Sequence, residues 1–145
     1  IPNVALSTDM IVGFPGETRD DFDATMSLLE AVRFHSLYSF KYSVRPNTLA
    51  SKRMADDVTE AEKTARIMAL QAAQRRIQLE LLQSAVGSVE EVLVDAISRR
   101  RTTEVSGRTS GNTIVNFAGG EELIGRLVPV RITEAAPNSV RGELV

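Results

Sequence analysis

The chain has 145 residues, of which 43% are hydrophobic, and its formal net charge is -2 at pH 7. This apolar content suffices for a buried core in one domain or two small ones, and the near-neutral charge excludes a globally basic nucleic-acid binder. No apolar run approaches the roughly 18 residues of a membrane span and no signal-peptide pattern is present, so we expect a cytoplasmic protein without a membrane partner. The chain starts at Ile1, without methionine and directly before a predicted strand, which suggests a fragment of a longer protein.

A strand and a sharp turn open the sequence. The segment Val4–Val12 is apolar and β-branched, which predicts a buried strand bounded by Gly13. Pro15 and Gly16 then force a turn. Glycines in such a turn admit a close ligand, and backbone amides at the start of a helix suit anions, although most turns of this composition are only turns.

A helix and a second strand come after the turn. Thr18 and Asp21 match a capping box, and apolar residues at helical spacing predict an amphipathic helix over Asp20–Arg33. The segment His35–Ser43 is the second predicted strand. Strand, helix and strand form a βα unit of a parallel sheet, in which ligand sites lie at the carboxyl ends of the strands.

A basic loop over residues 44–59 leads into a long predicted helix over Thr59–Ser84. The helix has apolar residues on two opposite sides, a wider distribution than a stripe that faces one core. Its apolar residues are Ala65, Met68, Ala72, Leu79 and Leu82 on one side and Ile67, Leu70, Ile77 and Leu81 on the other. We interpret it as a helix that packs on the first unit and also contacts the carboxyl-terminal part of the chain.

Short alternating segments separated by turn residues make up the rest of the chain. They predict five strands, at 89–98, 102–108, 112–117, 127–135 and 139–145. In the fourth, Val128, Val130 and Ile132 are expected to face inward. Five strands in so short a stretch favour a small closed barrel of the oligonucleotide-binding type. The fold class is therefore α/β plus all-β, with domains at 1–85 and 86–145 and a boundary near Ala85–Ser88.

Few side chains in the first unit point to chemistry. Glu17 lies in the predicted first helical turn, where a helix-dipole partner is a better interpretation than an acid/base pair with Asp9. His35 is the only histidine and the chain has no cysteine, so a histidine-based metal site is nearly excluded and His35 stays unassigned. Arg45 belongs to a locally basic rim that either binds a phosphate or carboxylate or is merely solvated. The other members of this rim are Lys41, Lys52 and Arg53.

The predicted barrel is not strongly charged. From Gly87 onward it has seven arginines, no lysine and eight acidic residues, and the run at 98–101 is typical of a solvated surface. Any contact with RNA there must use selected arginines and one stacking aromatic, Phe117.

Several motifs together resemble a known family. "DMIVGFPGET", "YSFKYSVRPNT", the long helix and "SGRTSGNTIVNF" with the sequence up to the carboxyl end occur in the order and spacing of the radical S-adenosylmethionine tRNA methylthiotransferases of the MiaB type. The resemblance covers nearly the whole chain. It implies that the first unit is the carboxyl-terminal part of a partial TIM barrel and that the second is a TRAM domain, an RNA-binding β-barrel.

The resemblance also implies an activity and cofactors. Such enzymes methylthiolate isopentenyladenosine beside the anticodon of tRNA, using S-adenosylmethionine and two 4Fe–4S clusters. The cysteines that hold the clusters are expected before Ile1. The fragment alone is therefore expected to be inactive and to bind neither cluster through its own residues.

The same resemblance implies a set of site residues. It places Asp9, Ile11, Gly13, Tyr42 and Ser43 at the cofactor. It places Arg45 near the substrate nucleotide, and Arg108, Asn112 and Phe117 on the surface that binds the anticodon stem-loop. Truncation of the sheet is expected to leave unpaired strand edges, through which a non-native dimer forms.

Other functions stay open at this point. The chain is alternatively a free-standing RNA-binding module, or a nucleotide-binding βα domain with a structural barrel, although no phosphate-binding loop is present. Related methylthiotransferases that act on threonylcarbamoyladenosine or on a ribosomal protein are a further alternative. The motifs "FKYSVRPNT" and "SGRT" favour the tRNA-directed type.

Overall fold

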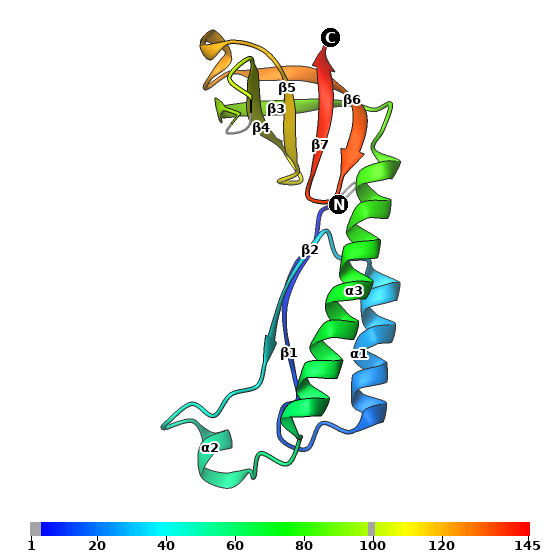
Figure 1. The fold of residues 1–145 in the computed structure, drawn as a ribbon, viewed down its shortest axis with the longest axis vertical. Helices are drawn as coiled ribbons and strands as arrows, with labels where there is room; N and C mark the ends of the chain where they lie inside the picture. Colours follow the sequence, from blue (N-terminus) through cyan, green and yellow to red (C-terminus); the bar gives the residue numbers. More distant parts are fainter. Residues whose placement is uncertain (1–3, 99–100) are drawn as a thin grey trace. The chain divides into compact units, whose positions relative to one another are not determined.

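The computed structural model describes residues 4–98 and 101–145 (Figure 1). Contacts divide the chain into two compact units. One is Leu6–Ile77, and the other contains Gln78–Val145. The helix α3 (Glu60–Ser84) runs from the first unit into the second.

The first unit contains a parallel pair of strands, as predicted. β1 (Ser7–Val12) pairs with β2 (Ser36–Lys41) in the register Ser7 to Ser36 through Val12 to Lys41. The helices α1 (Arg19–Val32) and α3 lie along one side of this two-stranded sheet (Figure 1). Gln71 of α3 donates to the Ser39 hydroxyl of β2 at 3.0 Å, which ties the helix to the sheet.

The expectation that the first strand is fully buried is wrong. Val12 is fully buried, but Ile11 is 54% exposed, and Tyr38 and Phe40 in β2 are 64% and 52% exposed. Asp9 is exposed on the same strand. Successive side chains of a strand point to opposite faces, and helices cover only one face of this sheet.

Local signals determine where the helices begin and end. The capping box of α1 is confirmed, because the Thr18 hydroxyl accepts from the Asp21 amide and the Asp21 carboxylate accepts from the Thr18 amide. Thr59 and Glu62 make the same reciprocal pair of bonds at the start of α3. A short helix, α2 (Leu49–Arg53), lies within the predicted loop and was not expected.

The apolar faces of α3 differ from the prediction. Met68, expected on a packing face, is 63% exposed. The buried positions in the first unit include two apolar residues of the other face, Leu70 and Ile77, together with Lys63 and Gln74. Near its end, α3 places Leu82 in the core of the second unit.

The second unit is a closed barrel, as predicted. Its strands are β3 (Val89–Ile97), β4 (Glu104–Thr109), β5 (Ile114–Ala118), β6 (Leu127–Ala136) and β7 (Ser139–Leu144), with a 3-10 turn, η1 (Glu121–Leu123), before β6. The order is β3-β4-β5-β7-β6, and the parallel pairing of β5 with β7 contributes to closure. Val130 and Ile132 are buried and Val128 packs against the core, as expected from the alternation.

Phe117 corrects one prediction. It was expected to offer a stacking face on the surface, but its side chain is 1% exposed in the barrel core. Alternation along β5 puts it on the same inward face as Val115, which is also buried. Phe117 therefore stabilises the barrel and does not stack on a base.

Candidate functional site

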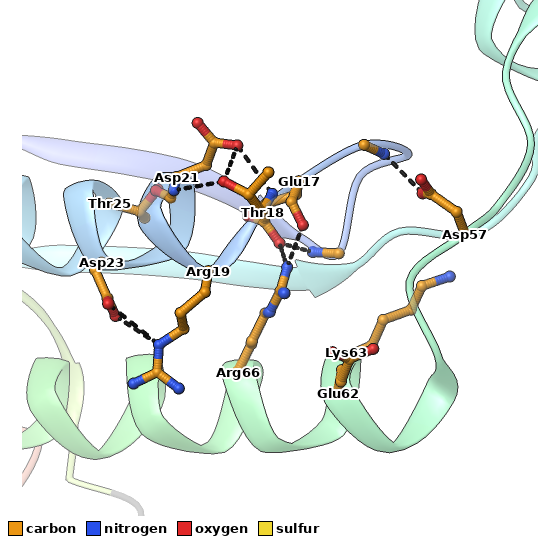
Figure 2. Close-up of polar contacts among 12 residues, drawn as sticks. Glu17, Thr18, Arg19, Asp21, Asp23, Thr25, Asp57, Glu62, Lys63 and Arg66 are labelled. Carbon is orange, nitrogen blue, oxygen red and sulfur yellow. Dashed lines mark hydrogen bonds and ion pairs between the residues drawn. The ribbon is translucent and has the colours of Figure 1, made fainter.

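The first candidate site is the corner after β1, formed by Gly13–Glu17 (Figure 2). Gly13 and Gly16 have φ angles of +70° and +82°, which favour glycine. The Gly13 amide donates to the Glu17 carboxylate at 2.5 Å, and the Gly16 amide donates to the Asp57 carboxylate at 2.7 Å. Carboxylates of the chain itself thus occupy two amides that the sequence suggested for an anion.

Glu17 connects the corner to α3. Its carboxylate accepts from Arg66 at 2.5 Å, and the Glu17 carbonyl accepts from the same guanidinium at 3.0 Å. Both side chains are only 11% exposed, and the guanidinium of Arg66 also lies 5.7 Å from the ring centre of Phe22. Glu17 precedes the N-cap, so its main partner is this arginine rather than the dipole of α1.

A buried lysine forms the other side of the corner. The Lys63 side chain is 4% exposed, and its ammonium lies 2.6 Å from the nearer oxygen of Asp56. The same ammonium lies 5.3 Å from the centre of the Tyr42 ring, which meets Phe14 edge to face at 5.1 Å. Lys63 was not among the residues predicted to form a site. The sequence feature that indicates its burial is its position seven residues before Leu70, which places both residues on the buried face of α3.

The structure divides the residues expected at the cofactor into two groups. Gly13 and the half-buried Tyr42 lie together at the corner, where the Tyr42 amide donates to the Val12 carbonyl at 2.9 Å. Asp9 and Ile11 lie on the exposed sheet face, in register with Tyr38 and Phe40. The remaining residue, Ser43, is exposed just after β2.

The basic rim is partly neutralised. Lys41 pairs with Glu60 at the start of α3. Lys52 and Arg53 occupy the last turn of α2. Arg45 is exposed, and its carbonyl accepts from Thr48 in the turn before α2.

The second candidate site is a concavity of about 850 Å³ in the barrel. It lies among β3, β4, β5 and the turn between β6 and β7. The polar and charged side chains that line it are Asp95, Ser98, Arg101, Glu104, Ser106, Arg108, Asn116, Asn138, Ser139 and Arg141. Three of these are arginines from separate parts of the sequence and two are acidic, so the fold gathers a small excess of positive charge that the total charge hides.

Glu104 holds two of these arginines. Its side chain is 10% exposed and pairs with Arg141 and, at 3.2 Å, with Arg101. The hydrogen bond from Arg141, aided by that from Arg101, holds the pKa of the Glu104 carboxyl below its usual range. The guanidinium side chains themselves stay accessible, since Arg101 is 63% and Arg141 34% exposed.

The third arginine is oriented by a turn. Arg108 donates to the side-chain oxygen of Asn112 at 2.9 Å and lies 3.6 Å from the Asp95 carboxylate. Asn112 has a φ of +64°, a conformation that asparagine tolerates better than most residues. Arg108 and Asn112, both predicted to contact RNA, are therefore joined to each other, and Arg108 lines the concavity.

The residues present do not fit an iron–sulfur cluster. The sequence has no cysteine. Within residues 4–98 and 101–145, no three histidine or acidic side chains gather as a metal site would require. In the same described residues, no helix is both long enough and apolar enough to cross a membrane.

Comparison with known proteins finds a domain family that matches most of the second unit. Residues 83–145 match the family model of the TRAM domain. The chain thus contains a TRAM domain. Nearly the whole chain, TRAM domain included, also matches proteins named tRNA-2-methylthio-N(6)-dimethylallyladenosine synthase.

These relatives are substantially longer. The protein of Methylococcus capsulatus is 49% identical over 99% of this chain and 31% of its own length. That of Thiobacillus denitrificans is 50% identical over 99% of the chain and 32% of its own length, and that of Pseudoalteromonas translucida is 45% identical over 99% and 30%. The resemblance to the MiaB-type methylthiotransferases is confirmed, and the chain spans about a third of the length of these curated relatives.

Proposed function

We propose that the chain is part of a tRNA methylthiotransferase that converts isopentenyladenosine beside the anticodon into its 2-methylthio form. The observation that carries the proposal is the 45–50% identity to synthases of that name over 99% of the chain. We propose two domains. Residues 1–85 are the end of the radical S-adenosylmethionine domain with its linking helix, and residues 86–145 are the TRAM domain. A cytoplasmic location remains a prediction.

The cofactors divide between this chain and the rest of the enzyme. S-adenosylmethionine and the two 4Fe–4S clusters supply the radical chemistry and sulfur insertion of the family. The clusters require cysteines that this chain does not have. The exposed sheet face offers a surface for a flat nucleoside ring, because Ile11 is 54% exposed there. Gly13 is buried and the space beside it is filled by Lys63, so it is proposed to border this surface through its backbone. Asp9, Ile11, Gly13, Tyr42 and Ser43 remain the residues proposed to hold the nucleoside.

Two further properties of the chain are proposals. The first is that the chain alone is inactive and binds S-adenosylmethionine weakly, which calorimetry that detects low-micromolar binding would contradict. The second is that chains pair through the unpaired edges of the two-stranded β1–β2 sheet. Light scattering that shows only monomers at high concentration would contradict this pairing.

For the second unit, we propose that the TRAM barrel binds the anticodon stem-loop of the substrate tRNA. Arg108 and the other arginines of the barrel concavity supply the positive charge. Arg45, exposed after β2, is proposed to lie near the substrate nucleotide. Phe117 no longer has a part in this contact, because it is buried.

A segment exchange tests the proposed activity. The matching segment of the Methylococcus capsulatus synthase is replaced by this chain, and 2-methylthio nucleosides in tRNA are measured by mass spectrometry in cells that lack their own enzyme. The control is the same exchange with the segment of the Pseudoalteromonas translucida synthase. We expect both chimaeras to modify tRNA, whereas modification by the control alone would refute the proposal.

A further inference from the structure

We propose that the barrel concavity binds the sugar-phosphate backbone of an RNA stem and does not read the bases of the loop. This inference rests on the proposed function, which supplies the RNA. It adds the place of the contact and the part of the RNA that is recognised.

The chemistry of the lining suits a nucleic-acid backbone. Arg101, Arg108 and Arg141 each present a guanidinium, whose planar donors match the oxygens of a phosphate. The hydroxyl and amide side chains of the same concavity, such as Asn116 and Ser139, suit ribose and phosphate oxygens. The side chains of the concavity can therefore bind a polyanion that also carries hydroxyl groups.

The described lining of the concavity offers no surface on which a base could stack. Proteins that read unpaired RNA bases splay them onto aromatic side chains. The described residues that line the concavity include no aromatic side chain, and the one aromatic residue of the barrel, Phe117, is 1% exposed. Without a stacking surface the concavity lacks the means to hold splayed-out bases, and in a paired stem the phosphates and riboses are the groups that face outward.

The three arginines are already oriented by protein partners. Glu104 holds Arg101 and Arg141 from the protein side, while both keep accessible surface. Asn112 and Asp95 hold Arg108 in the same way. A guanidinium has five donor hydrogens, so each arginine retains donors for a phosphate after bonding to its protein partner. Orientation in the free protein reduces the entropy lost on binding.

The test measures RNA affinity of the 145-residue chain as a function of salt. Arg141→Gln and Arg108→Gln each remove one charge from the concavity, and Arg126→Gln removes the same charge from an exposed position outside it. Each concavity variant should lower affinity for an anticodon stem-loop about tenfold. Each should also reduce the log–log salt slope by about 0.7 to 0.9, and Arg126→Gln should change both much less.

Base independence is tested with two further RNAs. One is a stem-loop of equal length with an unrelated sequence, and the other is a plain RNA duplex without a loop. We expect the wild-type chain to bind all three within about threefold, because the phosphate spacing is the same. Loss of binding when only the loop sequence changes would overturn the inference.

The outcomes separate this inference from the proposed function. If the wild-type chain binds RNA but both concavity variants behave like Arg126→Gln, the concavity is not the site and RNA binding by the barrel stands. If the wild-type chain binds no RNA at all, the concavity inference and the proposed RNA binding by the barrel are both refuted. Circular dichroism of each variant excludes loss of folding, and Arg108, whose partners are exposed or half-exposed, provides a second variant should Arg141→Gln destabilise the barrel.

Discussion

Substitution of Gly13 by alanine tests whether the buried lysine shapes the corner. A Cβ at this position would lie 2.4 Å from Cγ of Lys63, 3.1 Å from Cδ and 3.2 Å from Cε. The Lys63 side chain cannot easily move away, because it is 4% exposed and paired with Asp56. At Gly16, which also has positive φ, a Cβ would meet nothing within 4 Å. Gly16→Ala is therefore a matched control that carries only the backbone cost.

The expected losses combine a backbone cost and a packing cost. Alanine in the left-handed region costs roughly 1–2 kcal/mol, partly offset by the lower entropy of the unfolded chain, so Gly16→Ala should lose about 0.5–1 kcal/mol. Gly13→Ala adds an overpacking cost of about 1–3 kcal/mol and should lose about 2–4 kcal/mol in total.

Tyrosine fluorescence during urea unfolding reports the loss of stability of the first unit. The chain has two tyrosines and no tryptophan, and Tyr38 and Tyr42 both belong to Leu6–Ile77. In a Lys63→Ala background, which removes all three clashing atoms, the extra penalty of Gly13→Ala should disappear. Equal losses for the two glycine variants, or a Gly13→Ala penalty unchanged by Lys63→Ala, would show that Lys63 does not restrict the corner.

Three other substitutions test the helix cap, the barrel core and the buried acid. Thr18→Ala should lose about 1 kcal/mol of stability by tyrosine fluorescence, and the mid-helix Thr25→Ala should lose much less. Phe117→Ala should cost roughly 3–5 kcal/mol and raise hydrogen exchange throughout the barrel, whereas the half-exposed Phe40→Ala should leave the barrel unchanged. Because its arginine partners lower the pKa of Glu104, the stability it contributes is full above the ordinary glutamate value of about 4.3 and is lost as pH falls through the lowered pKa. Urea titrations followed by backbone NMR signals of β4 should therefore show a shallower acid loss for Glu104→Gln, and identical pH profiles would contradict this.

Part of the candidate sites was predictable because neighbours in sequence determine it. The sharp glycine corner and the pairing of the strands that end beside it follow from residue types and the order of elements. Arg108 and Asn112 are four residues apart on one hairpin, so their joint role was accessible to sequence reasoning. The bond from the Gly16 amide to Asp57 spans 41 residues, and nothing local in the sequence indicates it.

Features that depend on a spacing of a few residues can be predicted from the sequence alone. The capping box of Thr18 and Asp21, the alternation of Val130 and Ile132, and the five barrel strands are of this kind, because backbone geometry repeats every two or 3.6 residues. The same alternation indicates that Phe117 faces inward with Val115, although Phe117 was expected on the surface.

The long-range pairing of charged side chains, in contrast, depends on the tertiary structure. Arg66 pairs with Glu17 across 49 residues, and Arg141 with Glu104 across 37. The tertiary structure also leaves one face of the β1–β2 sheet exposed. The sequence of a strand does not show how many helices will cover it. Pairings over this sequence distance depend on which segments the fold brings close together. The type of a charged residue alone does not identify its partner.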